Sequence, residues 1–383
     1  MNSDRQRRAW ADIDLQALQA NLGVVRQHNQ NAGITAVIKS NGYGHGMEAV
    51  ARALSEAPVK IDRFAVATFD EAVALNMTGT GKRILLLEGF SDSEQARFLI
   101  ESDIEFVIHA DYQLAILKQI LREHRSNRQL TVWLKLDTGM HRLGLNDSEF
   151  LQTYQELMTL TQVGHIVVMS HLACADDSED PVAAANTNDQ LRRFNAALSE
   201  LTAFDPRQLD RSLAASAGIL AWPETHFDHV RPGVMLYGSS PLSNVTGVEL
   251  GLQPVMTLRA RVIAIKQVPA GGSIGYGATY TCDRPTRVGV VSIGYGDGYP
   301  RSAPTGTPVL VRTAGTYQRS CLLGRVSMDM ITIDLEDLGD TEVGDEVVLW
   351  GESLPADEVA RFAGTISYEL FCQVTGRVSY VYT

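Results

Sequence analysis

The chain has 383 residues, 45% apolar and 20% charged, a length that predicts two domains. Lys and Arg number 33 against 45 Asp and Glu, and the resulting net charge of −12 argues against nucleic acid and anionic membranes as partners. No apolar run reaches the roughly 18 residues of a membrane-spanning helix. Polar residues follow the N-terminal arginines where a leader peptide would be apolar. We therefore expect a cytoplasmic protein.

The four cysteines are far apart in the sequence, at Cys174, Cys282, Cys321 and Cys372. None forms a CxxC pair, and their spacing does not suit zinc ligands. We therefore predict free thiols in a reducing compartment and no metal site.

Residues 12–245 alternate between helical patterns and short apolar runs. The first helical segment follows Asp12 and Asp14, which are candidate caps, and residues 111–124 and 188–201 repeat the pattern. The apolar runs of strand length are residues 35–40, 63–68, 83–89, 105–110, 130–137, 164–172, 211–216 and 229–238.

Continuous apolar runs are typical of parallel strands that are buried on both faces. Eight strand–helix units in about 230 residues have the number and length of a TIM barrel. We therefore predict an α/β fold that begins with a TIM (β/α)8 barrel. A doubly wound open sheet is the alternative that the pattern leaves open.

The pattern of apolar and polar residues changes after residue 245. Gly, Pro and Asp separate the apolar runs there, and only short stretches could be helical. This pattern predicts a mainly antiparallel β domain, formed by residues 1–11 and 246–383. The runs are residues 255–268, 286–298, 307–313, 329–335 and 344–351.

The active site of a TIM barrel lies at the carboxyl ends of its strands. The polar residues that end the eight runs are therefore candidates as a set, although any single one is more often structural. They are Lys39, Ser40, Glu88, His109, Lys135, Asp137, His171, Ser216 and Arg231.

Lys39 is the sharpest candidate, because it ends the first strand and precedes a glycine-rich turn. A neutral lysine amine attacks carbonyl groups, so covalent attachment to an aldehyde is the natural hypothesis. The alternative is a lysine whose amine simply reaches solvent.

The end of the barrel offers an anion site. Ser216 can cap the helix that follows the seventh strand, and Gly233 allows close approach of the backbone. TIM barrels often bind phosphate with the loops after strands seven and eight. A lysine beside a phosphate site indicates pyridoxal 5′-phosphate (PLP), which carries both an aldehyde and a phosphate. The glycine pattern does not fit a P-loop nucleotide site.

Eight motifs are spread along the chain: AVIKSNGYGHG (36–46), WLKLDTGMHRLGL (133–145), SHLACAD (170–176), DHVRPGVMLYG (228–238), SIGYGATY (273–280), SIGYGDGYPR (292–301), GRVSMDM (324–330) and SYEL (367–370). In these motifs the sequence closely resembles the alanine racemase family, PLP enzymes built from a barrel and a β domain. The resemblance spans nearly the whole chain, and the motifs occur in the family's order.

The resemblance implies two catalytic bases, Lys39, which would also hold PLP covalently, and Tyr276 of the partner subunit. Arg231 would face the pyridine nitrogen, and His171 would link Arg231 to Tyr276. The phosphate would be held by Tyr43, Ser216, Tyr368 and the backbone of Gly233 and Val234.

The resemblance also implies the substrate contacts. Arg142 would bind the phenolic oxygen of the cofactor and the substrate carboxylate. Tyr295 and Met328 would narrow the entrance from across a dimer interface. Lys135 corresponds to a lysine that is often carboxylated in the family and positions Arg142. One departure is Ala215, since many members carry Asn before the phosphate serine.

These residue types suit racemisation, which removes a proton from one face of the α-carbon and returns one to the other. A free tyrosine has a pKa near 10, so a tyrosine base needs cationic neighbours. In the role that the resemblance implies, Arg231 would donate to the ring nitrogen without protonating it, which would weaken PLP as an electron sink and disfavour side reactions such as transamination.

Three other functions compete with a racemase. A PLP-binding module without turnover needs only the barrel, so the tyrosine-bearing β domain argues against it. A PLP decarboxylase also pairs a barrel with a β domain, but it usually places an acidic residue at the pyridine nitrogen, where this chain has Arg231. A β-domain adhesin or scaffold does not explain the polar residues of the barrel mouth.

The expected function is the interconversion of L-alanine and D-alanine, for peptidoglycan or for alanine catabolism. One methylene in a substrate changes binding by only about 1–3 kcal/mol, so serine and 2-aminobutyrate would be partly rejected. If the partner supplies Tyr276, a two-fold homodimer completes both sites at once.

Overall fold

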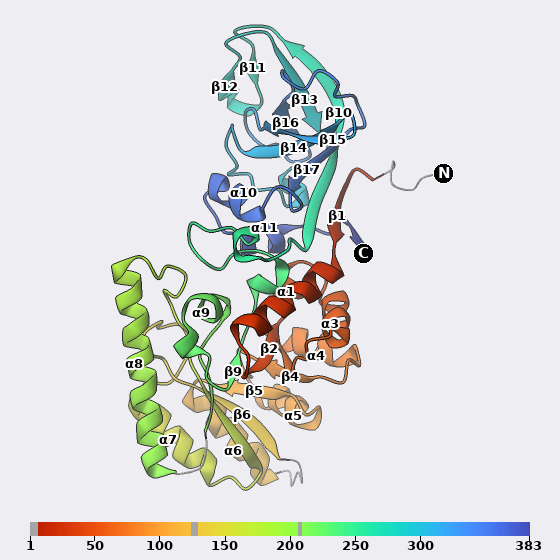
Figure 1. Ribbon diagram of the computed structural model, residues 1–383. Helices are drawn as coiled ribbons and strands as arrows, with labels where there is room; N and C mark the ends of the chain where they lie inside the picture. Colours follow the sequence, from red (N-terminus) through yellow and green to blue (C-terminus); the bar gives the residue numbers. More distant parts are fainter. Residues whose placement is uncertain (1–6, 124–128, 206–208) are drawn as a thin grey trace.

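The structure is a computed structural model that describes residues 7–123, 129–205 and 209–383. Figure 1 shows an α/β barrel with a second, β-rich domain stacked at one end of it. The predicted fold class is therefore confirmed. Strand β1 (Ala9–Ile13) pairs within the sheet of the second domain, so the predicted boundary at residue 12 falls inside this strand.

All eight predicted barrel strands are present and parallel. Most of their residues are buried, because one face fills the barrel and the other packs under helices. In sheet order they are β8 (Asp210–Ser212), β7 (Val163–Met169), β6 (Leu130–Lys135), β5 (Glu105–Ile108), β4 (Arg83–Leu86), β3 (Arg63–Val66), β2 (Gly33–Val37) and β9 (His229–Val230).

The sheet closes between its first and last strands. β9 pairs in parallel with β2, and Ala215 and Arg231, just beyond β8 and β9, form a parallel bridge. The order around the ring follows the order in the sequence. A doubly wound sheet would be open and would reverse its strand order, so this alternative is excluded.

The helices of the barrel domain are α1 (Leu15–His28), α2 (Lys39–Tyr43), α3 (Met47–Glu56), α4 (Phe69–Met77), α5 (Ser93–Glu101), α6 (Asp111–Glu123), α7 (Asp147–Met158), α8 (Pro181–Phe204) and α9 (Ser216–Ala221). The predicted helices at 111–124 and 188–201 correspond to α6 and α8, although residue 124 lies outside the described residues.

Only one of the two candidate caps of α1 acts as a cap. The Asp14 carboxylate accepts from the N–H groups of Gln16 and Ala17, at 2.9 and 2.8 Å. The prediction for Asp12 is wrong, because Asp12 lies in β1 and pairs with Arg259 across the sheet at 2.6 Å.

The second domain is mainly antiparallel, and each of its five predicted runs contains a strand. Besides β1, its strands are β10 (Met256–Val268), β11 (Ser273–Ile274), β12 (Tyr280–Thr281), β13 (Thr286–Val291), β14 (Pro308–Thr313), β15 (Thr316–Cys321), β16 (Ile331–Asp334), β17 (Glu346–Trp350) and β18 (Ser379–Tyr382). Its helices are α10 (Ala356–Ala363) and α11 (Ser367–Gln373).

Sequence patterning missed the strands at the edges of this sheet. The main sheet runs β15-β14-β17-β10-β1-β18, with β13 pairing with β10 and β16 pairing with β13. β15 is largely exposed and β18 is only partly buried, so neither carries a run of apolar residues. Strands with solvent on both faces lack the periodic apolar signal that prediction uses.

The two domains touch beside α2. The Tyr380 hydroxyl donates to the Gly44 carbonyl at 2.5 Å, and a Cβ placed on Gly44 would lie 2.1 Å from the carbonyl oxygen of Phe371. The Asp357 carboxylate of α10 accepts from the N–H of Gly247 at 2.8 Å, in the segment that leaves the barrel. These contacts bring α11 to the barrel mouth.

The structure also bears on the predicted free thiols and on membrane-spanning helices. The four cysteines all lie in the described part of the chain, and all are free. Among the described residues, no helix is long and apolar enough to cross a membrane.

Candidate active site

Five basic side chains gather at the carboxyl end of the barrel. Lys39 follows β2, Lys135 ends β6, Arg142 lies in the loop after β6, His171 follows β7 and Arg231 follows β9. The structure therefore brings together four of the polar residues that the sequence places at the strand ends, Lys39, Lys135, His171 and Arg231, with Arg142 beside them. Such a concentration of positive charge suits an anionic ligand.

Their mutual repulsion appears in the pKa of Lys135. Burial lowers the pKa of this amine most, and the charges of Arg231, Arg142 and Lys39 lower it further, to about 8. Burial and the same cations hold the pKa of His171 well below its usual value. His171 is therefore uncharged at neutral pH, and a fraction of Lys135 is uncharged as well.

Arg231 is held rigidly at the centre of the mouth. It is 4% exposed and donates to Ser212 Oγ at 2.5 Å and to the carbonyl oxygens of Ser170 and Leu213 at 2.6 and 3.1 Å. It also donates to Nδ1 of His171 at 3.4 Å. Burial lowers the pKa of Arg231 to about 10, so this guanidinium stays charged at neutral pH.

Lys39 opens a turn of unusual conformation. Ser40, Asn41 and Tyr43 have φ angles of 53°, 54° and 50°, and Gly42 between them has 64°. α2 is therefore mostly a left-handed turn rather than an ordinary helix. Each non-glycine residue in this conformation costs about 1–2 kcal/mol, so surrounding contacts must stabilise the turn.

An anion cradle lies beside this turn. Ser216 Oγ accepts from the N–H of Gly233 at 2.8 Å and from that of Met235 at 3.5 Å. A Cβ on Gly233 would lie 2.5 Å from the hydroxyl oxygen of Tyr43. The side chains of Tyr43 and Ser216 and the backbone of Gly233 thus converge on one small space, which only glycine leaves open.

Ser216 does not act as the helix cap that the sequence suggests. The N-cap of α9 is Ala215, and Ser216 is the first residue inside the helix. Its hydroxyl turns instead toward the segment before the 3-10 helix Val234–Tyr237. Strand β9 brings this segment next to α9, a contact that local sequence cannot reveal.

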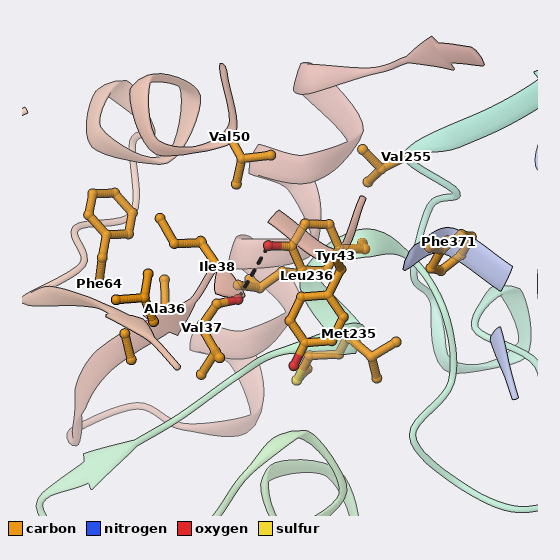
Figure 2. Packing of buried hydrophobic residues seen from close by; sticks show 14 of the residues in the cluster. Ala36, Val37, Ile38, Tyr43, Val50, Phe64, Met235, Leu236, Val255 and Phe371 are labelled. Carbon is orange, nitrogen blue, oxygen red and sulfur yellow. Dashed lines mark hydrogen bonds between the residues drawn. The ribbon is translucent and has the colours of Figure 1, made fainter. Parts of the chain in front are cut away.

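Aromatic packing fixes the Tyr43 side of the cradle. The rings of Tyr43 and Tyr237 stack at 4.8 Å, and Tyr368 of α11 lies 6.0 Å from Tyr43. The Tyr237 hydroxyl donates to the Val37 carbonyl at 3.2 Å, at the end of β2. Figure 2 shows Tyr43, from the barrel domain, and Phe371, from the second domain, in one cluster of buried side chains.

Burial raises the pKa of Tyr43 and of Tyr368, so both phenols remain protonated and can donate hydrogen bonds. Tyr237 was not predicted from the sequence. Its position in VMLYG resembles that of any core residue, and no local signal distinguishes a supporting aromatic from an ordinary one.

The remaining candidates lie on the second domain and face solvent in this chain. Tyr276 is 69% exposed, between β11 and β12, and Met328 is 52% exposed. Tyr295 lies beside Met328, since the Gly296 N–H donates to the Met328 carbonyl at 2.8 Å. β11 and β12 lie at the end of the second domain farthest from the barrel (Figure 1), so one chain does not bring Tyr276 to its own Lys39.

A closed barrel with a lysine and an anion cradle at its mouth, joined to a β domain, defines a class of enzymes that bind a small phosphorylated cofactor. Two family models cover the chain: alanine racemase, N-terminal domain, at residues 13–241, and alanine racemase, C-terminal domain, at residues 255–382.

Individual relatives agree with the family models. An alanine racemase of Aliivibrio salmonicida is 43% identical over 98% of this chain and 99% of its own length. The crystal structure of the biosynthetic alanine racemase of Pseudomonas aeruginosa superposes with a TM-score of 0.89 at 41% identity, covering 99% of this chain and 100% of that one.

A third comparison concerns a ligand. A Bartonella henselae alanine racemase with covalently bound pyridoxal phosphate superposes with a TM-score of 0.85 at 29% identity, covering 98% of this chain and 99% of that one. The chain belongs to the alanine racemase family. It is therefore an isomerase, and the predicted family and enzyme class are confirmed.

Proposed function

We propose that this chain interconverts L-alanine and D-alanine with PLP bound at the barrel mouth and attached to Lys39. The observation that carries the proposal is the cradle of Tyr43, Ser216 and Gly233 next to the Lys39 turn. A phosphate needs several donors in a small space, and this cradle places two hydroxyls beside the backbone of Gly233. The phenol of Tyr368 and the N–H of Val234 complete the set.

PLP, when bound, withdraws electrons from the α-carbon of an attached amino acid and so acidifies its α-proton. Arg231 would hold the pyridine nitrogen by donating a hydrogen bond. Its guanidinium keeps its proton, because its pKa stays near 10 even when it is buried. Four neighbouring acceptors fix the orientation of the Arg231 guanidinium. They belong to Ser170, Ser212, Leu213 and His171.

Two bases handle the proton. The Lys39 amine takes or returns it on one face of the α-carbon, and the phenol oxygen of Tyr276 of the partner subunit does so on the other. His171 connects the partner's Tyr276 to Arg231. Because His171 is neutral, it can accept from Arg231 through Nδ1 and donate through the other ring nitrogen.

Substrate binding combines charge and size. Arg142 pairs with the substrate carboxylate, and Lys135, when carboxylated by CO2, becomes an anion that orients Arg142. The lowered pKa of Lys135 supports this reaction, because only an uncharged amine attacks CO2. Tyr295 and Met328 restrict the entrance to small side chains, so serine is a poor but measurable substrate.

A homodimer follows from this assignment. Tyr276, Tyr295 and Met328 are exposed apolar side chains on the second domain, and a two-fold partner covers them while completing both sites. We further propose that the enzyme acts in the cytoplasm and provides D-alanine for peptidoglycan or serves alanine catabolism.

The test is an absorbance spectrum of the purified protein, followed by borohydride reduction and peptide mapping. We expect bound PLP, a reduced adduct on Lys39 and conversion of L-alanine to D-alanine. Bound PLP without racemisation would indicate a cofactor-binding module, and an adduct on another lysine would overturn the assignment of Lys39.

A further inference from the structure

The conformation of the Lys39 turn requires an explanation, because Ser40 and Asn41 occupy a backbone region that L-residues avoid. Within the turn, the N–H of Gly42 donates to the Ile38 carbonyl at 2.9 Å and that of Gly44 to the Ser40 carbonyl at 2.8 Å. The peptide that joins Lys39 to Ser40 points its N–H out of the turn, toward α4.

The acceptor of this N–H is the side chain of Glu71. Glu71 Oε1 accepts from the Ser40 N–H at 2.6 Å. Its other oxygen, Oε2, accepts from the N–H groups of Ala67 and Thr68 at 2.9 and 3.2 Å. Ala67 directly follows β3, so one carboxylate joins the ends of two neighbouring barrel strands.

A carboxylate is suited to this position because all three groups that meet it are N–H donors. Both of its oxygens accept, whereas an amide of the same shape would turn an NH2 group toward at least one donor. Hydrogen bonds to a charged acceptor are also stronger than neutral ones. Glu71 therefore stabilises a peptide orientation that Ser40 would not adopt by itself.

We propose that Glu71 is a positioning residue for Lys39. The Ser40 N–H belongs to the peptide plane that sets ψ of Lys39 and φ of Ser40. Without the carboxylate, this peptide can rotate and release Ser40 from the left-handed region, which moves the Lys39 backbone and the amine it carries. The proposal rests on the assignment of Lys39 as the lysine that holds PLP.

Glu71 also has an ordinary structural role, which a test must separate from positioning. It forms a capping box at the start of α4, in which the Glu71 N–H donates to Thr68 Oγ1 at 3.4 Å. Thr68→Ala removes that hydroxyl and leaves the hydrogen bond from the Ser40 N–H to Glu71 Oε1 intact. It is therefore the matched control for loss of the cap alone.

Glu71→Gln is the main variant. In the PLP-loaded protein we expect kcat to fall about 10- to 100-fold, since a displacement near 1 Å has effects of this size, with little change in KM for alanine. We also expect faster loss of PLP by absorbance and faster hydrogen exchange in residues 38–43. Thr68→Ala should lower the thermal midpoint of unfolding about as much as Glu71→Gln does. It should leave kcat, the rate of PLP loss and hydrogen exchange in residues 38–43 unchanged.

Ser40→Gly supplies a rescue, because glycine adopts left-handed φ without strain. In the double variant Glu71→Gln, Ser40→Gly, we expect kcat and PLP retention to recover by more than half of the loss on a logarithmic scale. Rescue is not expected if Glu71 only caps α4, so absence of rescue overturns the proposal. Equal behaviour of Glu71→Gln and Thr68→Ala overturns it as well.

If the Glu71→Gln protein folds poorly, a second variant tests the same proposal. Glu71→Asp keeps the charge but shortens the side chain, so it cannot reach Ala67 and Ser40 together, and Ser40→Gly should rescue it in the same way. If wild-type protein forms no adduct on Lys39, the proposed function fails. Hydrogen exchange at residues 38–43 would still report whether Glu71 holds the turn.

Discussion

Gly233 lies where the Tyr43 hydroxyl meets the first turn of α9. Its φ of −123° lies outside the left-handed region, and the crowding beside its α-carbon by itself requires glycine. An added Cβ would lie 2.5 Å from the Tyr43 hydroxyl oxygen and would occupy the proposed phosphate position. A single methyl group therefore separates an open cradle from a closed one.

We expect Gly233→Ala to weaken PLP binding at least about tenfold, equivalent to about 1.4 kcal/mol. Binding of pyridoxal, which lacks the phosphate, should change little, and absorbance titration measures both. Gly23→Ala in α1 is the control, since a Cβ there meets nothing within 4 Å. Equal weakening of PLP and pyridoxal would contradict the location of the cradle.

Lys135 predicts a pH dependence of stability. Its pKa is about 8 in the folded chain and 10.5 in the unfolded chain, so between these values the unfolded state binds more protons. Stability therefore rises with pH across this window, and below pH 8 the contribution of Lys135 is constant.

Urea unfolding of wild-type protein and of Lys135→Met in CO2-free buffer tests this prediction. The difference in unfolding free energy between the two proteins should increase from pH 8 to pH 10 in favour of the wild type. A flat difference would mean that Lys135 is not desolvated as described. Added bicarbonate should increase the intact mass of the wild type alone, by one CO2.

At the scale of elements, the contact between α2 and α11 carries the second domain onto the barrel mouth. Gly44 follows the left-handed turn with φ of 78°, and its α-carbon faces the backbone of Phe371. The same turn positions Lys39 and Tyr43, while α11 carries Tyr368. The cradle therefore depends on how closely two elements distant in sequence approach each other.

Gly44→Ala and Gly79→Ala form a matched pair. Both glycines have positive φ, 78° and 67°, so alanine strains the backbone similarly at each. A Cβ at Gly79 meets nothing within 4 Å, whereas one at Gly44 would lie 2.1 Å from the Phe371 carbonyl oxygen. Their difference isolates the contact between the domains.

Overpacking costs about 1–3 kcal/mol, so Gly44→Ala should be less stable than Gly79→Ala by this amount in urea unfolding. It should also lose racemase activity at least about tenfold, because α2 must shift. If the two variants had the same activity, the contact between α2 and α11 would not be required for the site.

At the scale of the whole molecule, one chain separates the two proposed bases. Lys39 lies at the barrel mouth, and Tyr276 lies at the far end of the second domain (Figure 1). In the proposed dimer, a two-fold partner would supply the missing half of each site. Activity should then belong to the dimer.

Mixing two inactive variants tests this prediction. Lys39→Ala and Tyr276→Phe should each be nearly inactive. After mixing and subunit exchange, heterodimers contain one intact site, so activity should recover to roughly a quarter of that of the wild type. Variants that remain inactive although exchange is verified by mass spectrometry would place both bases in one subunit.

Much of the candidate site was predictable because its residues lie in short motifs at the ends of strands. Lys39, Lys135, His171 and Arg231 follow apolar runs, and barrel topology brings the ends of parallel strands to one mouth. The predicted capping role of Ser216 is wrong, since its hydroxyl accepts from the Gly233 N–H and does not cap its own helix. Tyr237 and Glu71 carry no local signal of their roles.

The sequence by itself determined the fold class, the family and the identity of the proposed catalytic groups. The periodicity of apolar residues and the spacing of motifs are local properties, so they can be recognised in the sequence without the tertiary structure. Only the tertiary structure decided which side chains meet: Tyr43 with Gly233, Glu71 with Ser40 and α11 with α2. Such contacts join residues far apart in sequence, and their geometry depends on the packing of the whole barrel and of the second domain against it.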